Sequence, residues 1–258
     1  MTMVLTERRG SIAVLTLNNP AQYNALGGTL LADLDKALDA ALTGTEVRAI
    51  VLTGAGKGFC SGAQFGGDAF GRGDGVGDAM RKSINPLIER LRSSRIPVVV
   101  AVNGAAAGAG VGIALAGDIV IAGRSARFIL SFVRLGAVLD AGTSLFLQRV
   151  IGTARARALS LLGEPLAAET AAQWGLIWKC VDDDQLMTEA LAIAQKLADG
   201  PPVSIGLIKD QLEAAWSTGL SSTLDNEASA QSRAFATADL REGAAAFMEK
   251  RPPRFTGK

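Results

Sequence analysis

Residues 98–122 constrain the fold most, because they are apolar along almost their whole length. The valine-rich run Val98–Val102 is followed by Asn103-Gly104, by a segment of only alanine and glycine, and by the apolar residues 113–116. Apolar runs without polar alternation are typical of elements covered on both faces, so we expect a buried strand, a tight turn and a buried helix. Unpaired N–H groups in the first helical turn would stabilise an oxyanion set against residues 108–110. The alternative is that these small residues only allow close helix packing.

Composition excludes several classes of protein. The chain has 258 residues, 48% of them hydrophobic, which is enough to bury a large core. Its 26 Lys and Arg residues nearly balance its 25 Asp and Glu residues, so the sequence lacks the excess positive charge that is typical of nucleic-acid binding. No apolar segment reaches the roughly 18 residues of a membrane span, and the N-terminus lacks the order of a targeting signal. Cys60 and Cys180 have neither metal-ligand spacing nor a disulfide framework. We therefore expect a cytoplasmic protein that binds neither nucleic acid nor membrane.

The chain contains no histidine. Ser-His-Asp and Cys-His catalytic machinery and histidine-based metal sites are therefore excluded. Proton transfer near neutral pH has to use a carboxylate with a shifted pKa, a lysine, the single tyrosine Tyr23, or the substrate itself.

Hydrophobic periodicity predicts an alternation of strands and helices. A hairpin of strands is expected over residues 4–9 and 12–17, and a buried strand over 49–52. The last third of the chain is expected to be entirely helical. Helices are predicted over 26–41, 79–91, 141–152, 154–162, 167–174, 185–199, 203–217, 220–237 and 240–249, with Gly163 and Gly175 as stops and Asp140 as an N-cap.

A second glycine-rich turn follows a strand at residues 53–68, in the same layout as at Asn103. Two such turns, each exposing backbone N–H groups, would converge on one oxygen atom. The alternative is an ordinary strand-to-helix loop, because phosphate-loop spacing is missing. Residues 66–77 hold six glycines and are expected to form a mobile flap, on which Asp68 is a solvated carboxylate.

Eight segments in one order resemble the crotonase (enoyl-CoA hydratase/isomerase) superfamily, across nearly the whole chain. They read NPAQYNAL, GFCSGAQF, IPVVVAVNGAAAGAG, AGDIVIA, ARF, LGAVLDAGTSLFLQRVIG, AAETAAQWGLI and ADLREGAAAFMEKRPPRF. The resemblance implies an α/β fold, a ClpP/crotonase-like spiral of ββα units over residues 1–200 and a C-terminal helical trimerisation region over 201–258. It also implies an acyl-CoA substrate, no cofactor besides the coenzyme A of that substrate, and a homotrimer or hexamer.

The resemblance places the thioester carbonyl between the backbone N–H groups of Ala63 and Ala109. It also places residues 22–25 and 61–63 along the coenzyme A channel, mainly through their backbone. Phe247 and Lys250 fall where a neighbouring subunit covers the adenosine and 3′-phosphate, although Lys250 is otherwise a solvated charge at a helix C-terminus. The substrate-binding positions implied are Gln22, Asn24, Ala25, Ser61, Gln64, Phe65, Gly108, Gly110, Phe132, Leu139, Phe247 and Lys250.

At two positions that matter for the reaction, the sequence departs from the pattern of the family it resembles. Family hydratases hold a water with two glutamates, and the matching positions here are Gly112 and Phe132. Neither moves a proton, so hydration by that route is expected to be lost. Asp140 instead resembles the proton shuttle of phenylacetate-degradation ring-epoxide and enoyl-CoA isomerases, with Leu139 in place of their proline.

The chemistry expected of Asp140 is a proton transfer between two carbons. One carboxylate can take a proton at one carbon and return it at another once the enolate is stabilised. An apolar wall of Phe65, Phe70, Phe132 and Leu139 is expected to raise its pKa and exclude water. The alternative for Asp140 is a helix N-cap worth about 1 kcal/mol.

Rival functions remain beside the isomerase. One is an enoyl-CoA hydratase with residual activity. Another is an acyl-CoA hydrolase or dehalogenase in which the aspartate is a nucleophile, because DAGTS resembles a segment of halobenzoyl-CoA dehalogenases. That branch also uses a histidine and a nearby tryptophan, which this chain lacks at those positions. The last is a non-catalytic acyl-CoA-binding subunit. Cys60 is expected to be a small packed residue and no nucleophile.

Overall fold

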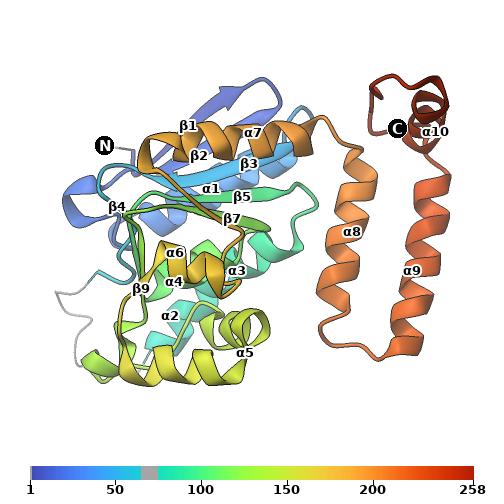
Figure 1. The fold of residues 1–258 in the computed structure, drawn as a ribbon. Coiled ribbons are helices and arrows are strands. Elements are labelled where there is room, and N and C mark those ends of the chain that lie inside the picture. Colours follow the sequence, from blue (N-terminus) through green and yellow to red (C-terminus); the bar gives the residue numbers. More distant parts are fainter. Residues whose placement is uncertain (1, 65–74) are drawn as a thin grey trace.

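The main sheet has six strands in the order β1-β2-β3-β5-β7-β10 (Figure 1). The computed structural model describes residues 2–64 and 75–258. β1 and β2 form an antiparallel hairpin that turns at Gly10, whose φ is +59°, and the later neighbours pair in parallel. The predicted hairpin is therefore confirmed. The strands are β1 Val4–Arg9, β2 Ile12–Leu17, β3 Ala49–Gly54, β5 Val98–Val102, β7 Ile119–Gly123 and β10 Lys179–Val181.

A second sheet has four strands in the order β4-β6-β8-β9. β4, β6 and β8 each follow a strand of the main sheet along the chain, and a helix comes next. This repeated step confirms the expected spiral of ββα units. The second sheet consists of β4 Gly58–Cys60, β6 Ala105–Ala107, β8 Arg127–Ile129 and β9 Leu166–Ala167. The sequence predicted only a turn where β6 lies, because alanine has low strand propensity. The segment forms a strand because it pairs with β4 and β8.

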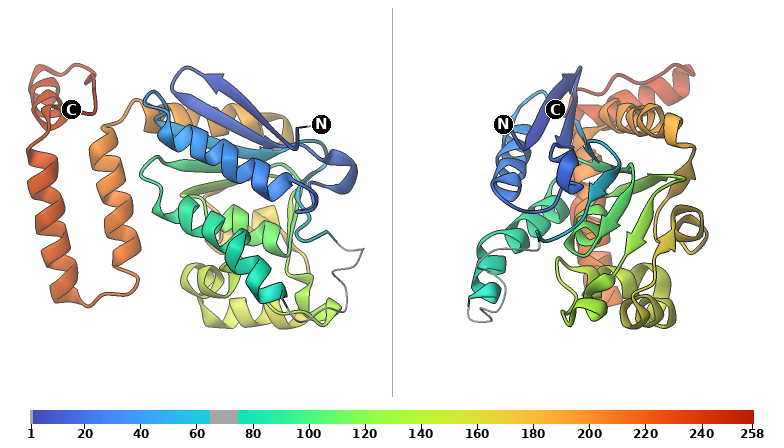
Figure 2. Two further views of the ribbon diagram at one scale, coloured as in Figure 1. Left: turned by 180° about the vertical axis from the view of Figure 1, so that it is seen from behind. Right: turned by 90° about the vertical axis from the view of Figure 1, so that its left-hand side faces the viewer.

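Helices cover both faces of the main sheet. α7 (Leu186–Ala198) packs on one face, against alternate residues of β2, β3 and β5. α1 (Leu30–Thr43) lies on the opposite face, as the reverse view shows (Figure 2, left), and belongs to the larger core. Val98–Val102 is buried at every residue, which confirms the burial expected from its apolar sequence.

The predicted helix over residues 79–91 is wrong as a single element. Two helices, α2 (Val76–Lys82) and α3 (Ile84–Ser93), meet at Ser83, whose φ and ψ are −129° and −83°. Pro86 causes the break, because it has no N–H group and its ring clashes with the carbonyl four residues earlier. α5 (Thr143–Leu162) also bends, at Gly152. The remaining helices of the body are α4 (Ala109–Leu115) and α6 (Ala168–Gln173), with short 3-10 turns η1 (Pro20–Gln22), η2 (Ser131–Leu135) and η3 (Asp183–Gln185).

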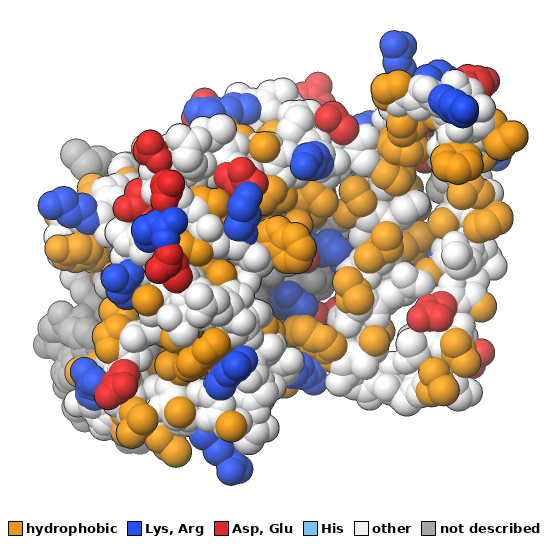
Figure 3. Space-filling view, in the orientation of Figure 1, with side chains coloured by type: hydrophobic (Ala, Val, Ile, Leu, Met, Phe, Trp, Pro, Cys, Tyr) orange, Lys and Arg blue, Asp and Glu red, His pale blue; other side chains and the backbone are white. Residues whose placement is uncertain are grey.

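The chain ends in three helices, α8 (Pro202–Ala214), α9 (Leu220–Phe235) and α10 (Ala238–Glu249). α8 and α9 run side by side at the edge of the molecule (Figure 1). Large hydrophobic side chains are exposed along these helices (Figure 3), including Leu212, Leu220, Leu224, Phe235, Phe247 and Met248. Such exposure is typical of a surface that packs on a partner. The domain boundary near residue 200 and the trimer or hexamer stay predictions.

Membrane association was tested on the helices. Within residues 2–64 and 75–258, no helix combines the length and apolar character needed to cross a bilayer.

Candidate active site

Asp140 lies in a strained turn just before α5. Ala141 and Gly142 both have left-handed backbone conformations, with φ of +48° and +77°. The N–H and hydroxyl groups of Thr143 donate to the Asp140 carbonyl, at 2.9 and 2.7 Å. A non-glycine residue in this region costs about 1 to 2 kcal/mol, so the surroundings have to hold Ala141 there.

The prediction that Asp140 is the N-cap of α5 is wrong. Gly142 occupies the cap position, and no side chain makes a capping hydrogen bond. The two left-handed residues separate Asp140 from the first helical turn, so its carboxylate does not reach the N–H groups there. Its Oδ1 atom is buried and has no hydrogen-bond partner within the described parts of the chain. A buried, unpaired carboxylate oxygen is costly for stability and is typical of functional groups.

Burial raises the pKa of the Asp140 carboxyl from 3.8 to about 6. The cause is desolvation, because the charged form loses water without gaining a partner. A pKa near 6 suits an acid or base that works close to neutral pH.

The turn that carries Asp140 packs directly on α4 at Gly112. A Cβ placed on Gly112 would lie 2.3 Å from the Ala141 carbonyl oxygen and 2.5 Å from the Ala141 Cβ. Neither position can move easily, because Ala141 is buried and already strained. Only glycine fits at position 112 while the turn keeps this conformation, so a glutamate side chain there is sterically excluded.

The two glycine-rich turns do converge, as the sequence predicted. Gly62 has a φ of +83°, and a Cβ on it would lie 2.6 Å from the Ala107 carbonyl oxygen and 3.3 Å from the Ala109 nitrogen. Gly110 is as tightly packed, since its Cβ would lie 2.2 Å from the Cys60 carbonyl oxygen. The backbones at residues 60–62 and 107–110 are therefore in contact.

The two predicted oxyanion donors, the N–H groups of Ala63 and Ala109, belong to an exposed and a buried residue. Ala63 forms an isolated parallel bridge with Leu26, in which the Leu26 N–H group donates to the Gly62 carbonyl at 2.8 Å. Ala109 is the first residue of α4, so its N–H group has no partner inside the helix. Neither amide donates to an acceptor within residues 2–64 and 75–258. Ala63 is also exposed, which leaves its amide accessible to a ligand.

Hydrogen bonds join residues 22–25 to the end of β4, beside Ala63. The Ser61 hydroxyl donates to the Gln22 carbonyl at 3.1 Å, and the Ser61 N–H group donates to the Tyr23 carbonyl at 2.9 Å. Ala25 is buried beside them, whereas Gln64 is exposed and its side chain lies against Gly27. These predicted channel residues are therefore brought together.

Asn24 ties the same segment to β4 from the inside. Its side-chain amide is fully buried and donates to the carbonyls of Ala55, Gly58 and Phe59, at 3.0, 2.8 and 3.1 Å. Its oxygen accepts from the Asn19 N–H group at 2.8 Å. The Asn24 side chain thus forms its hydrogen bonds with backbone groups, and its role is to hold this segment in place.

Of the predicted apolar wall, the structure describes Phe132 and Leu139, and their place beside the Asp140 carboxylate stays a prediction. Phe132 is buried, and its ring lies 3.7 Å from the point where a Cβ on Gly108 would be. Leu139 is half-buried against the main core and borders a cavity of about 310 Å³ along α5. Phe65, Phe70, Asp68 and most of the predicted flap lie outside the described residues. Its last two residues, Val76 and Gly77, begin α2.

Phe247 and Lys250 are far from this site within one chain. They lie at the end of α10, on the opposite side of the molecule from β4 (Figure 1). Phe247 is 83% exposed, and Lys250 is the C-cap of its helix, as expected. Their role toward coenzyme A would require a neighbouring subunit and stays a prediction.

Cys60 is a packed residue. It is fully buried in β4, and desolvation raises the pKa of its thiol to about 12. A thiol that stays protonated at neutral pH is a poor nucleophile. Among the described residues, no group of three or more His, Cys, Asp or Glu side chains is arranged to hold a metal ion.

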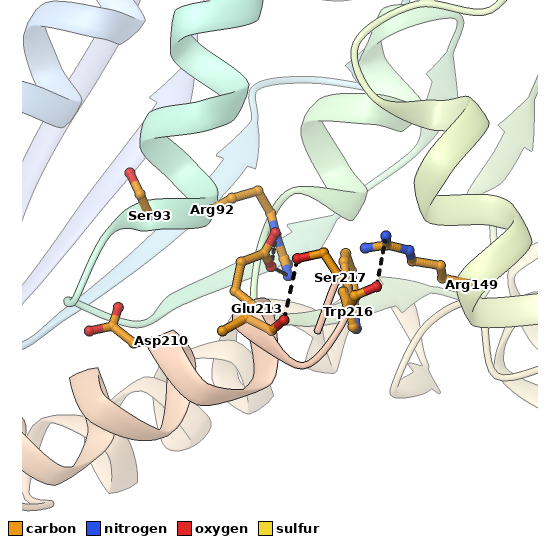
Figure 4. Close-up of a pocket in the computed structure, with 8 residues that line it drawn as sticks. Arg92, Ser93, Arg149, Asp210, Glu213, Trp216 and Ser217 are labelled. Atoms are coloured by element: carbon orange, nitrogen blue, oxygen red, sulfur yellow. Dashed lines mark hydrogen bonds and ion pairs between the residues drawn. The ribbon is translucent and has the colours of Figure 1, made fainter. Parts of the chain in front are cut away.

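Sequence reasoning missed the aromatic side chains behind the Asp140 turn. Phe146 of α5 covers Gly142, and Trp216 lies beside Phe146 at a cavity of about 460 Å³ between α3, α5 and α8 (Figure 4). Phe146 follows Gly142 by four residues, which is the spacing that brings side chains onto one helix face. No local pattern points to Trp216, because it is distant in the chain.

Comparison with known proteins identifies the family of the chain. The model of the enoyl-CoA hydratase/isomerase family matches residues 7–258. The 1,2-epoxyphenylacetyl-CoA isomerase of Escherichia coli K12 is 42% identical over 261 residues, covering 100% of both chains. A Rhodobacter capsulatus protein named as an enoyl-CoA hydratase is 43% identical over 96% of this chain and 95% of its own. The crystal structure of an enoyl-CoA hydratase from Bacillus anthracis matches with a TM-score of 0.94, at 31% identity over 99% of this chain and 100% of that chain. The chain therefore belongs to the enoyl-CoA hydratase/isomerase family.

Proposed function

We propose that the protein is an acyl-CoA isomerase that shifts a carbon–carbon double bond, or rearranges a ring epoxide, with Asp140 as its proton shuttle. The observation that carries the proposal is the buried and unpartnered Oδ1 of Asp140, on a turn packed against the helix that Ala109 begins. Family membership supplies the substrate class, a thioester of coenzyme A.

The steps follow from the groups available. The thioester oxygen accepts hydrogen bonds from the N–H groups of Ala63 and Ala109. Asp140 removes a proton from C2 of a 3-enoyl thioester, and the electron pair of that C–H bond moves onto the thioester oxygen as the enolate forms. The protonated Asp140 then returns the proton to C4, which leaves a double bond between C2 and C3 and restores the carboxylate. Removing one such amide typically costs about 3 to 4 kcal/mol of transition-state stabilisation.

The environment of Asp140 fits this cycle. One carboxyl group has to be a base in the first step and an acid in the second, so a pKa of about 6 serves both directions. Phe132 beside the Gly108 turn limits the access of water, which would otherwise compete for the proton.

A hydratase is the second candidate, because hydratase names outnumber isomerase names among the relatives. Hydration in this family would need a second acid or base to hold the water. Gly112 and Phe132 stand at the two expected glutamate positions, and Gly112 cannot be replaced without moving Ala141. The isomerase is therefore the better-supported reading.

The test is an assay of the purified protein with a 3-enoyl-CoA and with crotonyl-CoA. We expect the first to be converted to the conjugated 2-enoyl thioester and the second to be hydrated slowly or not at all. Asp140→Asn should lower the isomerisation rate by about 100-fold or more and keep coenzyme A binding. Asp184→Asn, at an exposed aspartate, is the matched control.

Isotopic labelling sharpens the test. With deuterium at C2, a single shuttle predicts that part of the label appears at C4 of the product. Faster hydration of crotonyl-CoA than isomerisation would favour the hydratase. An inactive unmodified protein that still binds acyl-CoA would favour a binding subunit.

A further inference from the structure

An aromatic and cationic stack joins the C-terminal helices to the body. Trp216, just after α8, lies between Arg92 of α3 and Arg149 of α5 (Figure 4). The two guanidinium carbons are 4.8 and 4.4 Å from the indole ring. Contacts of this kind between a cation and an aromatic face are stabilising, and more so when the cation is desolvated.

Each cation of this stack is also fixed by hydrogen bonds. Arg92 pairs with Glu213 of α8 through two nitrogens, and Arg149 donates to the Trp216 carbonyl at 3.2 Å. The indole is therefore held on both faces.

The stack continues to the Asp140 turn through Phe146. The ring of Phe146 is 6.5 Å from that of Trp216, tilted by 55°, and Arg92 lies 5.7 Å from its centre. Phe146 in turn covers Gly142, since a Cβ on Gly142 would lie 2.7 Å from its ring. On its other side the turn rests against Gly112. The strained residue Ala141 and its neighbour Gly142 are thus clamped between α4 and Phe146.

We propose that Trp216 is a positioning residue for Asp140: by holding Phe146 in place, it fixes the turn that aims the carboxylate. The expected effect on the isomerisation rate rests on the proposed function, whereas the expected effect on the position of the Asp140 turn does not. Phe146 packs against the Trp216 ring on one side and covers Gly142 on the other, so the influence on Asp140 passes through packing. A misplacement of the order of 1 Å far from the chemistry can cost up to about 100-fold in rate.

The experiment compares Trp216→Ala and Trp216→Phe with Trp174→Ala. Trp174 is the matched control, because it is also partly buried against the main core and also stacks on an arginine, Arg155, at 4.9 Å. We expect Trp216→Ala to lower kcat for isomerisation by about 10-fold with little change in KM. Trp216→Phe should recover most of the rate, and Trp174→Ala should change it by less than about 2-fold.

A second measurement does not depend on activity. Carbon-13 NMR of the protein with labelled aspartate follows the titration of Asp140, whose signal is identified by its loss in Asp140→Asn. We expect the Asp140 pKa to fall toward its ordinary value in Trp216→Ala and to stay raised in Trp174→Ala.

The outcomes separate the two proposals. If the unmodified protein does not isomerise any enoyl-CoA but the titration moves only in Trp216→Ala, the positioning role stands and the proposed function fails. If Trp216→Ala matches Trp174→Ala in both kcat and titration, the positioning role is refuted.

Discussion

Replacing Asp140 by asparagine should make the protein more stable at neutral pH while it loses activity. The Oδ1 atom of the Asp140 carboxyl is buried without a partner, and the pKa of the carboxyl rises from 3.8 to about 6 on folding. A raised carboxyl pKa means that folding favours the neutral form, so the charged form destabilises the fold. Asparagine is always neutral and of nearly the same shape, so it removes that cost.

The size of this stability difference follows from the pKa shift of Asp140. Stability from the neutral carboxyl is fully present below pH 3.8, and is lost as the pH rises through about 6. A shift of this size corresponds to at most about 3 kcal/mol above pH 7. Asp140 is partly exposed, so solvent screening reduces this to about 1 to 2 kcal/mol.

Urea unfolding of both proteins at pH 8 and pH 4 measures the difference, at one protein concentration because any association of the chains would contribute to stability. We expect Asp140→Asn to be more stable than the unmodified protein by about 1 to 2 kcal/mol at pH 8, and by clearly less at pH 4. Asp184→Asn should show neither effect. An asparagine variant that is equally stable or less stable at pH 8, or a difference independent of pH, would refute the reasoning.

Further predictions concern the same site and its support. The isomerisation rate should rise with pH through an apparent pKa of about 6, because the first step needs the Asp140 carboxylate; a profile flat from pH 5 to 8 would contradict this. Ala109→Pro removes one amide donor at a helix position that tolerates proline, so kcat should fall by about 100- to 1,000-fold. Leu220→Pro, at the first residue of α9, is its control and should leave kcat unchanged. Asn24→Asp directs a charge at three carbonyls, so it should destabilise the fold by about 3 kcal/mol or more at pH 7 and by less at pH 4, measured by urea unfolding.

Local sequence patterns predicted four strands of the main sheet, β1, β2, β3 and β5, but not β7 or β10. Val98–Val102 is apolar at every position, and no arrangement except burial on both faces satisfies such a run. The convergence of the two glycine-rich turns was also predictable, because each follows a strand of the same sheet. The three alanines of β6 carry no strand signal, so only their neighbours in the fold reveal them.

The details of the Asp140 turn needed the structure. An aspartate before a helix is usually a cap, and the sequence alone does not show that Ala141 adopts a left-handed conformation. Ala141 is held there by Gly112, about 30 residues earlier in the chain, and by Phe146 through Gly142. Contacts between such distant segments are set by packing, which no local pattern encodes.

The contact between Gly112 and Ala141 also limits how this chain can change its chemistry in evolution. A single substitution of Gly112 by glutamate would collide with backbone and Cβ atoms before its carboxylate reached any water. A glutamate at this position would therefore require the loop before α5 to retreat first, and that retreat would displace Asp140. A single substitution of Gly112 would thus disturb the turn that carries Asp140 and would not simply add a second carboxylate beside it.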